Sequence, residues 1–337
     1  MSAKKAVLLV NVGTPERDDV PSVRRFLSRF LNDRRVIDLP WLLQKILVNG
    51  IIVPFRAKGS TKLYRRLWTE EGSPILLYLN GLSQKVQDLL GDDYQVFPTM
   101  RYGKPSLKEA LKTVGKDRFE ELIVLPLFPQ YASSTAGSVV QYVMNEVKSW
   151  NTMPEIRFVG QFYKDPGFLT AFTNQIKSYN PEKYDHVIFS YHGLPLRQID
   201  RVHPEMKGLA CSCTAEMPAH GTLCYKATCY ETSRLLAKQS GIDRKNYTVA
   251  FQSRLSKNWL EPFTDAVLKK LITDGKKKVL VVSPAFVADC LETTVEIGMD
   301  YKELFLKLGG EELVLVESLN DNDDWAKAVV SLIDKGA

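Results

Sequence analysis

The chain has 337 residues, of which 45% are hydrophobic and 25% are charged. That size and balance suit two globular domains with ordinary cores, and they exclude a disordered chain. The formal net charge of +6 is mild for this length, and the compact basic run Lys276–Lys278 stands where a loop should lead into a strand. We therefore expect that run to face solvent, and we expect no nucleic-acid partner.

The first expected element is a strand at Ala6–Val10, an apolar run too short for the core of a secretion signal. The most apolar later stretch, Trp41–Phe55, is interrupted by Gln44, Lys45 and Asn49. It is therefore not expected to span a membrane. These features predict a cytoplasmic protein.

The lip segment, residues 41–66, combines an apolar stripe with several cations, namely Arg56, Lys58, Lys62, Arg65 and Arg66. Apolar residues mixed with cations suit a lip that rests peripherally on the inner face of a membrane or on an amphiphilic ligand. An ordinary helix packed on a sheet gives the same pattern, so both interpretations stand.

Apolar runs of five to eight residues then alternate with amphipathic stretches of helical length, which is typical of parallel α/β layers. Three strand ends also recur in the same order, which indicates two similar halves. The pairs are VLLVNVGTP (7–15) with VIFSYHGLP (187–195), Tyr94-x-Val96 and Arg101 with Tyr247-x-Val249 and Arg254, and VLPLF (124–128) with VSPAF (282–286). The sequence therefore predicts an α/β fold of two similar halves with parallel sheets and a cleft between them.

The predicted N-terminal half comprises residues 1–157 together with a last helix at 323–337, and it carries the lip segment. The predicted C-terminal half comprises residues 158–322 and contains a cysteine-rich insert at 205–230. The sequence does not determine the oligomeric state, because it cannot separate apolar surface from apolar core.

Three carboxylates, Asp289, Glu292 and Glu296, follow the apolar run Val279–Val282 at spacings of three and four. On a helix that follows a strand, this spacing would place them on one face. That face would lie at the carboxyl end of the strand, where open α/β sheets build their sites. A solvated acidic face near a helix N-terminus is the plainer interpretation.

His192 follows the expected strand Val187–Ser190, and Gly193 and Pro195 predict a turn that holds the imidazole at the sheet edge. The repeat puts His192 at the same end of the sheet as the three acids. An imidazole that faces carboxylates can bind a divalent metal or move protons. The chain contains no HExxH, phosphate-loop or GxGxxG motif, which argues against a zinc protease and against nucleotide chemistry.

Four segments resemble the diagnostic segments of the ferrochelatase family, in the family's order and over nearly the whole chain. They are LFPQYASSTAGS (127–138), SYHGLP (190–195), AFQSR (250–254) and SPAFVADCLET (283–293). The resemblance implies two Rossmann-like domains with a porphyrin cleft between them. It also implies a lyase that inserts ferrous iron into a porphyrin, the last step of haem biosynthesis.

The resemblance also implies roles for individual residues. His192 matches the family's active-site histidine and Glu292 its partner glutamate, which bind the ferrous iron or take pyrrole protons. Asp289 and Glu296 match acids that continue the polar path behind Glu292. The residues that match porphyrin contacts are Arg56, Tyr64 and Ser73 near the propionates, Arg101, Tyr102 and Tyr131 in the pocket, and Trp259 at the cleft wall.

The reaction itself explains why such residues are needed. A flat porphyrin hides its nitrogen lone pairs in the ring plane and carries two inner protons. We therefore expect the protein to bind a buckled ring better than a flat one, which favours metal entry and release of the flat product.

Four of the five cysteines, Cys211, Cys213, Cys224 and Cys229, follow the spacing C-x-C-x10-C-x4-C. Such a group indicates a metal centre or two disulfides, and the expected reducing compartment favours a metal. Zinc ribbons prefer C-x2-C pairs, whereas some ferrochelatases resemble this chain here and carry a two-iron, two-sulfur (2Fe-2S) cluster. The cluster is thus favoured over zinc, while Cys290 is expected to be a buried, small apolar residue.

Val12 precedes the first Gly-Thr-Pro, where family members that metallate coproporphyrin often have a tyrosine. Together with the lipophilic lip, this favours protoporphyrin IX as the substrate. Two other interpretations stay open from the residues alone. One is a non-catalytic, two-lobed module that binds a tetrapyrrole or a metal, and the other is a chelatase for cobalt and a corrin-like ring.

Overall fold

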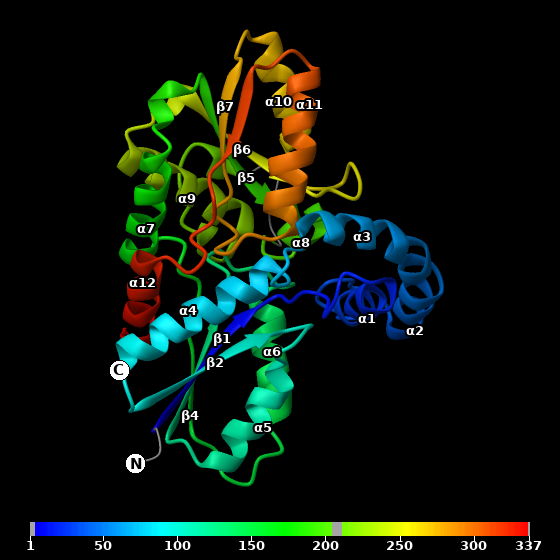
Figure 1. The fold of residues 1–337 in the computed structure, drawn as a ribbon, viewed down its shortest axis with the longest axis vertical. Coiled ribbons are helices and arrows are strands. Elements are labelled where there is room, and N and C mark those ends of the chain that lie inside the picture. The colour runs from blue at the N-terminus through cyan, green and yellow to red at the C-terminus, as the bar shows by residue number, and fades with distance from the viewer. Residues whose placement is uncertain (1–3, 204–210, 336–337) are drawn as a thin grey trace. The chain divides into compact units, whose positions relative to one another are not determined.

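The computed structural model describes residues 4–203 and 211–335, which form two compact units. Unit 1 comprises Met1–Phe128, Ala132–Gln161 and Asn320–Ala337, and unit 2 comprises Pro129–Tyr131 and Phe162–Leu319. Each unit contains a four-stranded parallel sheet with helices around it (Figure 1). The predicted α/β fold with two parallel sheets is confirmed.

The sheet of unit 1 has the strand order β2-β1-β3-β4, and all neighbouring strands are parallel. Its strands are β1 (Lys5–Asn11), β2 (Tyr94–Met100), β3 (Glu121–Pro126) and β4 (Glu155–Phe158). In the central strand β1, every side chain from Ala6 to Val10 is fully buried. A strand that is covered on both faces is apolar without alternation, which is why the sequence predicted this one.

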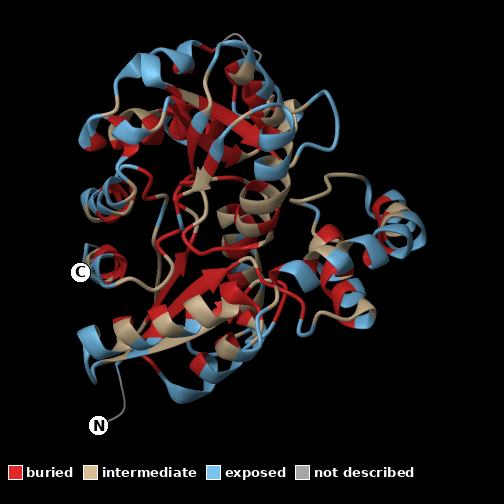
Figure 2. Cartoon of the chain, turned by 45° about the horizontal axis from the view of Figure 1, so that its top comes forward, coloured by how far each residue is buried: buried red, intermediate tan, exposed pale blue. Residues whose placement is uncertain are grey.

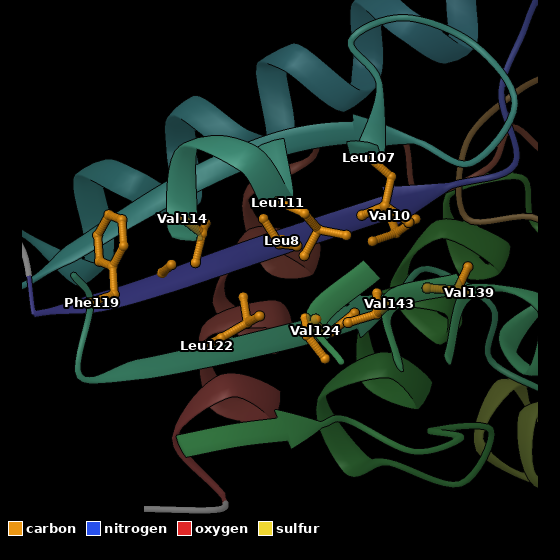
Figure 3. Close-up of a cluster of buried hydrophobic side chains, with 12 residues drawn as sticks. Leu8, Val10, Leu107, Leu111, Val114, Phe119, Leu122, Val124, Val139 and Val143 are labelled. Atoms are coloured by element: carbon orange, nitrogen blue, oxygen red, sulfur yellow. The ribbon is translucent and has the colours of Figure 1, made fainter. Parts of the chain in front are cut away.

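Helices cover the sheet of unit 1. On one face, α5 (Leu107–Asp117) and α6 (Ala136–Val147) enclose an aliphatic core around Leu8 and Val10 of β1 (Figure 3). Helix α4 (Pro74–Leu90) packs on β1 and β2, and α12 (Asp323–Asp334) packs on α4. The last predicted helix is therefore present, and it begins where the Asn322 side chain accepts a hydrogen bond from the Trp325 backbone N–H (2.7 Å).

The lip segment forms an almost continuous helical run next to α1 (Val20–Leu31). The run consists of α2 (Trp41–Lys45), the π-helix η1 (Ile46–Ile52) and α3 (Val53–Leu67). Helix α3 packs against α1 (Figure 1), and the ring of Phe26 meets the ring of Tyr64 edge-on at a centroid distance of 6.1 Å. The inner face of the run is thus fixed by packing, whereas much of its outer face is exposed (Figure 2).

The sheet of unit 2 has the order β6-β5-β7-β8, again with all neighbours parallel. Its strands are β5 (His186–His192), β6 (Tyr247–Gln252), β7 (Lys278–Val282) and β8 (Glu312–Leu315). Its longer helices are α7 (Pro166–Ser178), α9 (Tyr225–Ser240), α10 (Thr264–Thr273) and the π-helix η7 (Leu291–Tyr301), which continues into α11 (Lys302–Lys307). Shorter helices are α8 (Leu196–Asp200), η2 (Pro181–Lys183), η4 (Ser212–Thr214), η5 (Gly221–Leu223) and η6 (Arg244–Asn246).

The two sheets have the same topology, which confirms the internal repeat predicted from the sequence. In each unit the second strand lies at one edge and the first strand pairs with the second and third. In both units, the segment that follows the second strand folds back and forms a backbone hydrogen bond with the end of that strand. The Met100 backbone N–H donates to the Pro105 carbonyl (2.7 Å) in unit 1, and the Phe251 N–H donates to the Pro262 carbonyl (2.8 Å) in unit 2.

Candidate active site

The carboxyl end of the unit 2 sheet brings His192 and Gln252 together as the last residues of β5 and β6. They are opposite each other in the parallel ladder, and the Gly193 backbone N–H donates to the Gln252 carbonyl (2.8 Å). A Cβ at Gly193 would lie 2.9 Å from that carbonyl oxygen. The residue after His192 must therefore be glycine for the two strand ends to approach this closely.

The imidazole of His192 is oriented by the adjacent turn. Its Nδ1 lies 2.6 Å from the Gly193 carbonyl oxygen, which can only accept a hydrogen bond, so Nδ1 carries the proton. In the neutral ring the lone pair is then on Nε2, which can bind a metal or take a proton. The Tyr225 hydroxyl donates to the His192 carbonyl (3.0 Å), and the Trp259 ring centroid lies 6.3 Å from that of the imidazole.

Gln252 links this strand end to the acidic helix. Its Oε1 accepts a hydrogen bond from the Ser190 hydroxyl (2.6 Å), and its Nε2 donates to the backbone carbonyl of Glu292 (2.8 Å). The amide therefore holds the first turn of η7 against the ends of β5 and β6. His192 and Glu292 are positioned by contacts to the same residue.

Helix η7 begins at a cap built from Cys290 and Thr293. The Cys290 backbone N–H donates to the Thr293 hydroxyl (2.9 Å), and the Cys290 side chain accepts from the Thr293 backbone. Cys290 is buried, as predicted. Because a π-helix bonds residue i to i+5, it has more than four residues per turn, and Glu292 and Glu296 lie on the same face.

Glu296 is the most firmly held of the three acids. Its carboxylate accepts from the Ser253 backbone N–H (2.8 Å), from the Ser253 hydroxyl and from the Tyr301 hydroxyl (3.0 Å). Burial raises the pKa of Glu296 and the Glu292 charge raises it further, whereas the Ser253 hydrogen bonds and the His192 charge act in the opposite direction; the net pKa is raised. A carboxyl group of this kind is suited to take up and pass on a proton.

Asp289 differs from the other two acids, and the prediction of a single helical face is wrong for it. It precedes the cap of η7, so it lies outside the helix. Its buried carboxylate accepts from the Thr293 hydroxyl (3.1 Å) and from the Ser318 backbone N–H (3.3 Å). The reason is local: the Cys290–Thr293 cap starts the helix one residue after Cys290, which the acid spacing alone did not indicate.

In unit 1, Arg101 and Tyr102 belong to a buried polar network at the end of β2. The Arg101 guanidinium donates to Asp33 (2.8 Å) and Ser138 (2.9 Å), and the Tyr102 hydroxyl donates to Asp33 (2.8 Å). Burial alone would raise the pKa of Asp33, but hydrogen bonds from Ser138, the Arg35 backbone and Tyr102, together with the Arg101 charge, lower it overall. Asp33 is therefore an ionised anchor for both predicted pocket residues.

The other predicted porphyrin contacts are distributed over both units. In unit 1, Arg56 is exposed on α3, Tyr64 is buried against α1, and the Ser73 hydroxyl is 2.8 Å from the Thr14 hydroxyl. In unit 2, Tyr131 is half-buried and Trp259 lies beside His192.

Sequence reasoning missed several residues that hold the predicted ones, namely Asp33, Ser138, Gln252, Ser253 and Tyr301. Three of these stand inside the quoted segments, Ser138 in LFPQYASSTAGS and Gln252 and Ser253 in AFQSR, so the motifs carried a signal for them. Asp33 had none, because the two pocket residues that it anchors, Arg101 and Tyr102, are more than 60 residues away along the chain.

The described part of the cysteine-rich insert, from Cys211 onward, has all four cysteines buried and unpaired as thiols; positions 205–210 of the predicted insert lie outside the described residues. Burial raises the pKa of Cys213 to about 12, and the charge of the buried Lys226 acts against that rise. Burial also raises the pKa values of Cys224 and Cys229. Bound metal would therefore be needed to keep these thiols ionised.

Comparison with known proteins decides the family. Residues 4–337 match the family model described as ferrochelatase. The chain belongs to the ferrochelatase family. A ferrochelatase of Coxiella burnetii (strain Dugway 5J108-111) is 42% identical over 338 residues, which cover 98% of this chain and 94% of that protein. A ferrochelatase of Legionella pneumophila (strain Lens) is 41% identical over 335 residues, which cover 98% and 99%.

This ferrochelatase also shares its fold with two solved structures. The structure of SirB from Bacillus subtilis with Fe3+ matches with a TM-score of 0.54 and 12% identity, covering 99% of this chain and 96% of that one. The sirohydrochlorin chelatase SirB from Bacillus subtilis subspecies spizizenii, in complex with cobalt, matches with a TM-score of 0.53 and 11% identity, covering 99% and 95%. At such low identity the likeness extends to the fold alone.

Membership of this family assigns the chain to the metal chelatases, which are lyases, and to iron insertion into a porphyrin in haem biosynthesis. Within the described residues, no helix has both the length and the hydrophobicity needed to cross a membrane.

Proposed function

We propose that this ferrochelatase inserts ferrous iron into protoporphyrin IX to form protohaem, and that His192, Glu292 and Glu296 handle the iron and the displaced protons. The carrying observation is the shared anchor: Gln252 pairs with His192 in the sheet and donates to the Glu292 carbonyl (2.8 Å). The charges of His192 and Glu292 both act on Glu296, so the three groups are electrostatically linked.

The reaction exchanges two pyrrole protons for one Fe2+ ion, so the protein must accept two protons for each metal ion inserted. The Nε2 lone pair of His192 can take one proton or bind the ion, because Nδ1 is already bonded to the Gly193 carbonyl. Glu296, whose pKa is raised chiefly by burial, can take a proton from Glu292 on the same helical face. The hydrogen bonds from Ser253 and Tyr301 fix the position of the Glu296 carboxylate.

The porphyrin contacts follow from the residue types. Arg56 supplies an exposed cation for a propionate, and Trp259 supplies an aromatic face beside the imidazole. Tyr64, Ser73, Arg101, Tyr102 and Tyr131 complete the proposed set of substrate-binding residues. Asp289 is proposed to support the acidic helix, since it bonds to Thr293 of the cap.

Glu292→Gln tests the central role. The variant keeps the shape of the side chain but loses the charge, so we expect metal insertion to fall by about 100-fold or more while porphyrin binding stays nearly unchanged. Insertion of Fe2+ or Zn2+ is followed by absorption, and binding by porphyrin fluorescence quenching. Glu303→Gln, an exposed acid on α11, is the matched control. Normal turnover of Glu292→Gln would remove Glu292 from the mechanism.

Val12 and the lip segment are the two features that favour protoporphyrin IX over coproporphyrin III as the substrate. Val12 occupies the position before Gly13 where a tyrosine is expected for coproporphyrin. We expect faster turnover of protoporphyrin IX than of coproporphyrin III, measured as kcat/KM with the same metal. The reverse order would assign the chain to the coproporphyrin branch without affecting the iron-inserting role.

The lip segment is proposed to rest on the cytoplasmic face of a membrane. Six large apolar side chains of this segment are between 52% and 81% exposed, namely Trp41, Leu42, Leu43, Ile46, Ile51 and Phe55. Exposed cations follow them on α3, at Arg56, Lys58, Lys62, Arg65 and Arg66. An apolar row next to cations suits the interface of an anionic bilayer.

Vesicle binding tests the lip. We expect co-sedimentation with vesicles that contain phosphatidylglycerol, and we expect Phe55→Asp combined with Leu42→Asp to reduce it strongly. Met153→Asp, at an exposed methionine outside the lip, is the control. Equal binding of all three proteins would contradict the membrane role.

The cysteine-rich insert is proposed to hold a metal centre. The 2Fe-2S cluster predicted on Cys211, Cys213, Cys224 and Cys229 is supported by the burial of all four sulfurs and by the nearby buried Lys226, which offsets thiolate charge. Zinc at the same cysteines is the alternative. A protein made with iron supplied and oxygen excluded should be coloured if the cluster forms, and colourless if it does not.

A further inference from the structure

The hydroxyl of Tyr225 lies between the active-site strand end and the cysteine-rich insert. It donates a hydrogen bond to the backbone carbonyl of His192 (3.0 Å). It also forms a hydrogen bond with the side chain of Cys229, one of the four cysteines of the proposed metal centre. Tyr225 and Cys229 are one helical turn apart on α9, so they lie on the same face of that helix. One side chain therefore contacts both the strand end and the cysteine group.

Helix α9 and the end of β5 are held together beside this contact. The Tyr191 hydroxyl, from the residue before His192, is 2.9 Å from the Ser233 hydroxyl of α9. Tyr191, Ser233, Tyr225 and Cys229 are all buried. Burial raises the pKa of Cys229, and the hydrogen bond from Tyr225 acts in the opposite direction. The Tyr225 hydroxyl therefore stabilises negative charge on the Cys229 sulfur.

The other acceptor of Tyr225 belongs to the peptide group that orients the active-site imidazole. The His192–Gly193 peptide is bonded on both sides, because its carbonyl accepts from Tyr225 and its N–H donates to the Gln252 carbonyl (2.8 Å). The imidazole Nδ1 in turn lies 2.6 Å from the Gly193 carbonyl oxygen. Weakening the Tyr225 bond would therefore loosen the backbone to which the imidazole is attached.

The His192 carbonyl and the Cys229 sulfur compete for one proton, since a phenol carries a single O–H. A neutral thiol is a weak acceptor, so in the thiol form the carbonyl is the better partner. Metal binding takes the place of the thiol proton and gives the sulfur thiolate character, which makes it a stronger acceptor. A metal ion at Cys229 should therefore draw the Tyr225 O–H toward the sulfur and weaken its bond to His192.

We propose that Tyr225 is a positioning residue that couples the metal centre of the insert to the active-site histidine. The coupling rests on the metal centre proposed above, and it gives the insert a role in iron insertion. Loading of the four cysteines sets how firmly the His192–Gly193 peptide is held. The change is local, because it requires only that one hydroxyl proton shift between two acceptors that are already in place.

Hydrogen–deuterium exchange of the Gly193 amide tests the coupling without an activity assay. The full-length protein is compared after growth with added iron and zinc and after removal of metal by a chelator under reducing conditions, with the metal content measured in both forms. In the parent protein, Gly193 should exchange about 2- to 10-fold faster in the metal-loaded form, the range expected for the loss of one hydrogen bond. Tyr225→Phe keeps the ring and removes the proton, so the difference between the two forms should disappear.

Tyr230→Phe is the matched control, because Tyr230 is another buried tyrosine of α9, with its ring centroid 6.4 Å from that of Phe251. It should keep the difference seen in the parent protein. Equal or slower exchange in the loaded parent would overturn the coupling alone, and that comparison needs no variant to fold. The coupling is also overturned if Tyr225→Phe keeps the full difference. A parent protein that holds no metal at its cysteines would refute the proposed metal centre and the coupling with it.

Discussion

Two arginines stand at equivalent points of the internal repeat, after the second strand of each sheet. Arg101 in unit 1 pairs with Asp33 at 2.8 Å, with side-chain exposures of 15% and 9%. Arg254 in unit 2 pairs with Asp265 at the same distance of 2.8 Å, with exposures of 38% and 23%. Each arginine thus pairs with an aspartate at the same distance, but the aspartates come from different elements and the two pairs are removed from water to different degrees.

The other contacts of the two arginines increase the difference in burial between the two ion pairs. The Arg101 guanidinium also lies over the rings of Tyr102 and Tyr142, at 4.6 and 4.3 Å from the centroids, and donates to Ser138. The Arg254 guanidinium lies over one ring, that of Phe263, at 3.9 Å from its centroid. Breaking a buried pair leaves an uncompensated charge, whereas an exposed pair is solvated when broken. Equal distance thus does not imply equal energy.

Arg101→Ala should have the largest effect on stability. Removing the cation leaves the Asp33 carboxylate buried, so we expect the free energy of unfolding to fall by about 3 kcal/mol. Urea unfolding followed by circular dichroism measures it. The double variant Arg101→Ala with Asp33→Asn should recover part of the loss, and a single-variant loss below about 1 kcal/mol would contradict the buried-pair interpretation.

Gly193→Ala should have the next largest effect. The added Cβ would lie 2.9 Å from the Gln252 carbonyl oxygen, a backbone atom that cannot move without separating β5 from β6. We expect a loss of about 2 kcal/mol, typical of overpacking, together with reduced metal insertion. Gly160→Ala is the control, because its Cβ would meet nothing within 4 Å. Similar behaviour of the two variants would show that the strand ends do not need this close approach.

Glu296→Gln tests the buried acid through pH. A carboxyl group whose pKa is raised on folding holds more protons in the folded than in the unfolded state, so it destabilises the protein as pH rises through its folded pKa. Glutamine does not titrate, so the variant lacks this pH-dependent loss of stability. Relative to the parent, its thermal stability should therefore improve from pH 4 to pH 8, by about 1.4 kcal/mol for each unit of the raised pKa. A difference that does not change with pH would argue against the raised pKa.

Arg254→Ala should have the smallest effect. The pair with Asp265 is partly exposed, so we expect a loss below about 1 kcal/mol that shrinks further in 1 M salt. Urea unfolding at two salt concentrations measures it beside Arg101→Ala. If both variants lost the same free energy, the contrast between the two units would be wrong.

The sequence predicted the two parallel sheets because their central strands are uninterrupted apolar runs and because three strand ends recur. It could not predict the register. Tyr94 is opposite Lys5 in unit 1, whereas Tyr247 is opposite Val187 in unit 2, although the repeated segments align Val187 with Val7. A shift of two residues keeps every side chain on its original face, so hydrophobic patterning cannot detect it.

For the candidate site, the motifs predicted His192 and Glu292 and the spacing of the acids predicted Glu296, but neither predicted the contacts that orient them. Ser253 reaches Glu296 with both its N–H and its hydroxyl from a backbone conformation with φ of 61°. Such a conformation is uncommon for serine and depends on the path of the whole loop.

The uncovered aliphatic and aromatic row on α2, η1 and the start of α3 has a practical consequence for anyone handling the protein. In water without lipid or detergent, such rows of neighbouring molecules reduce their contact with solvent by touching one another. Sedimentation behaviour should then depend on protein concentration, and a mild non-ionic detergent should abolish that dependence by coating the row.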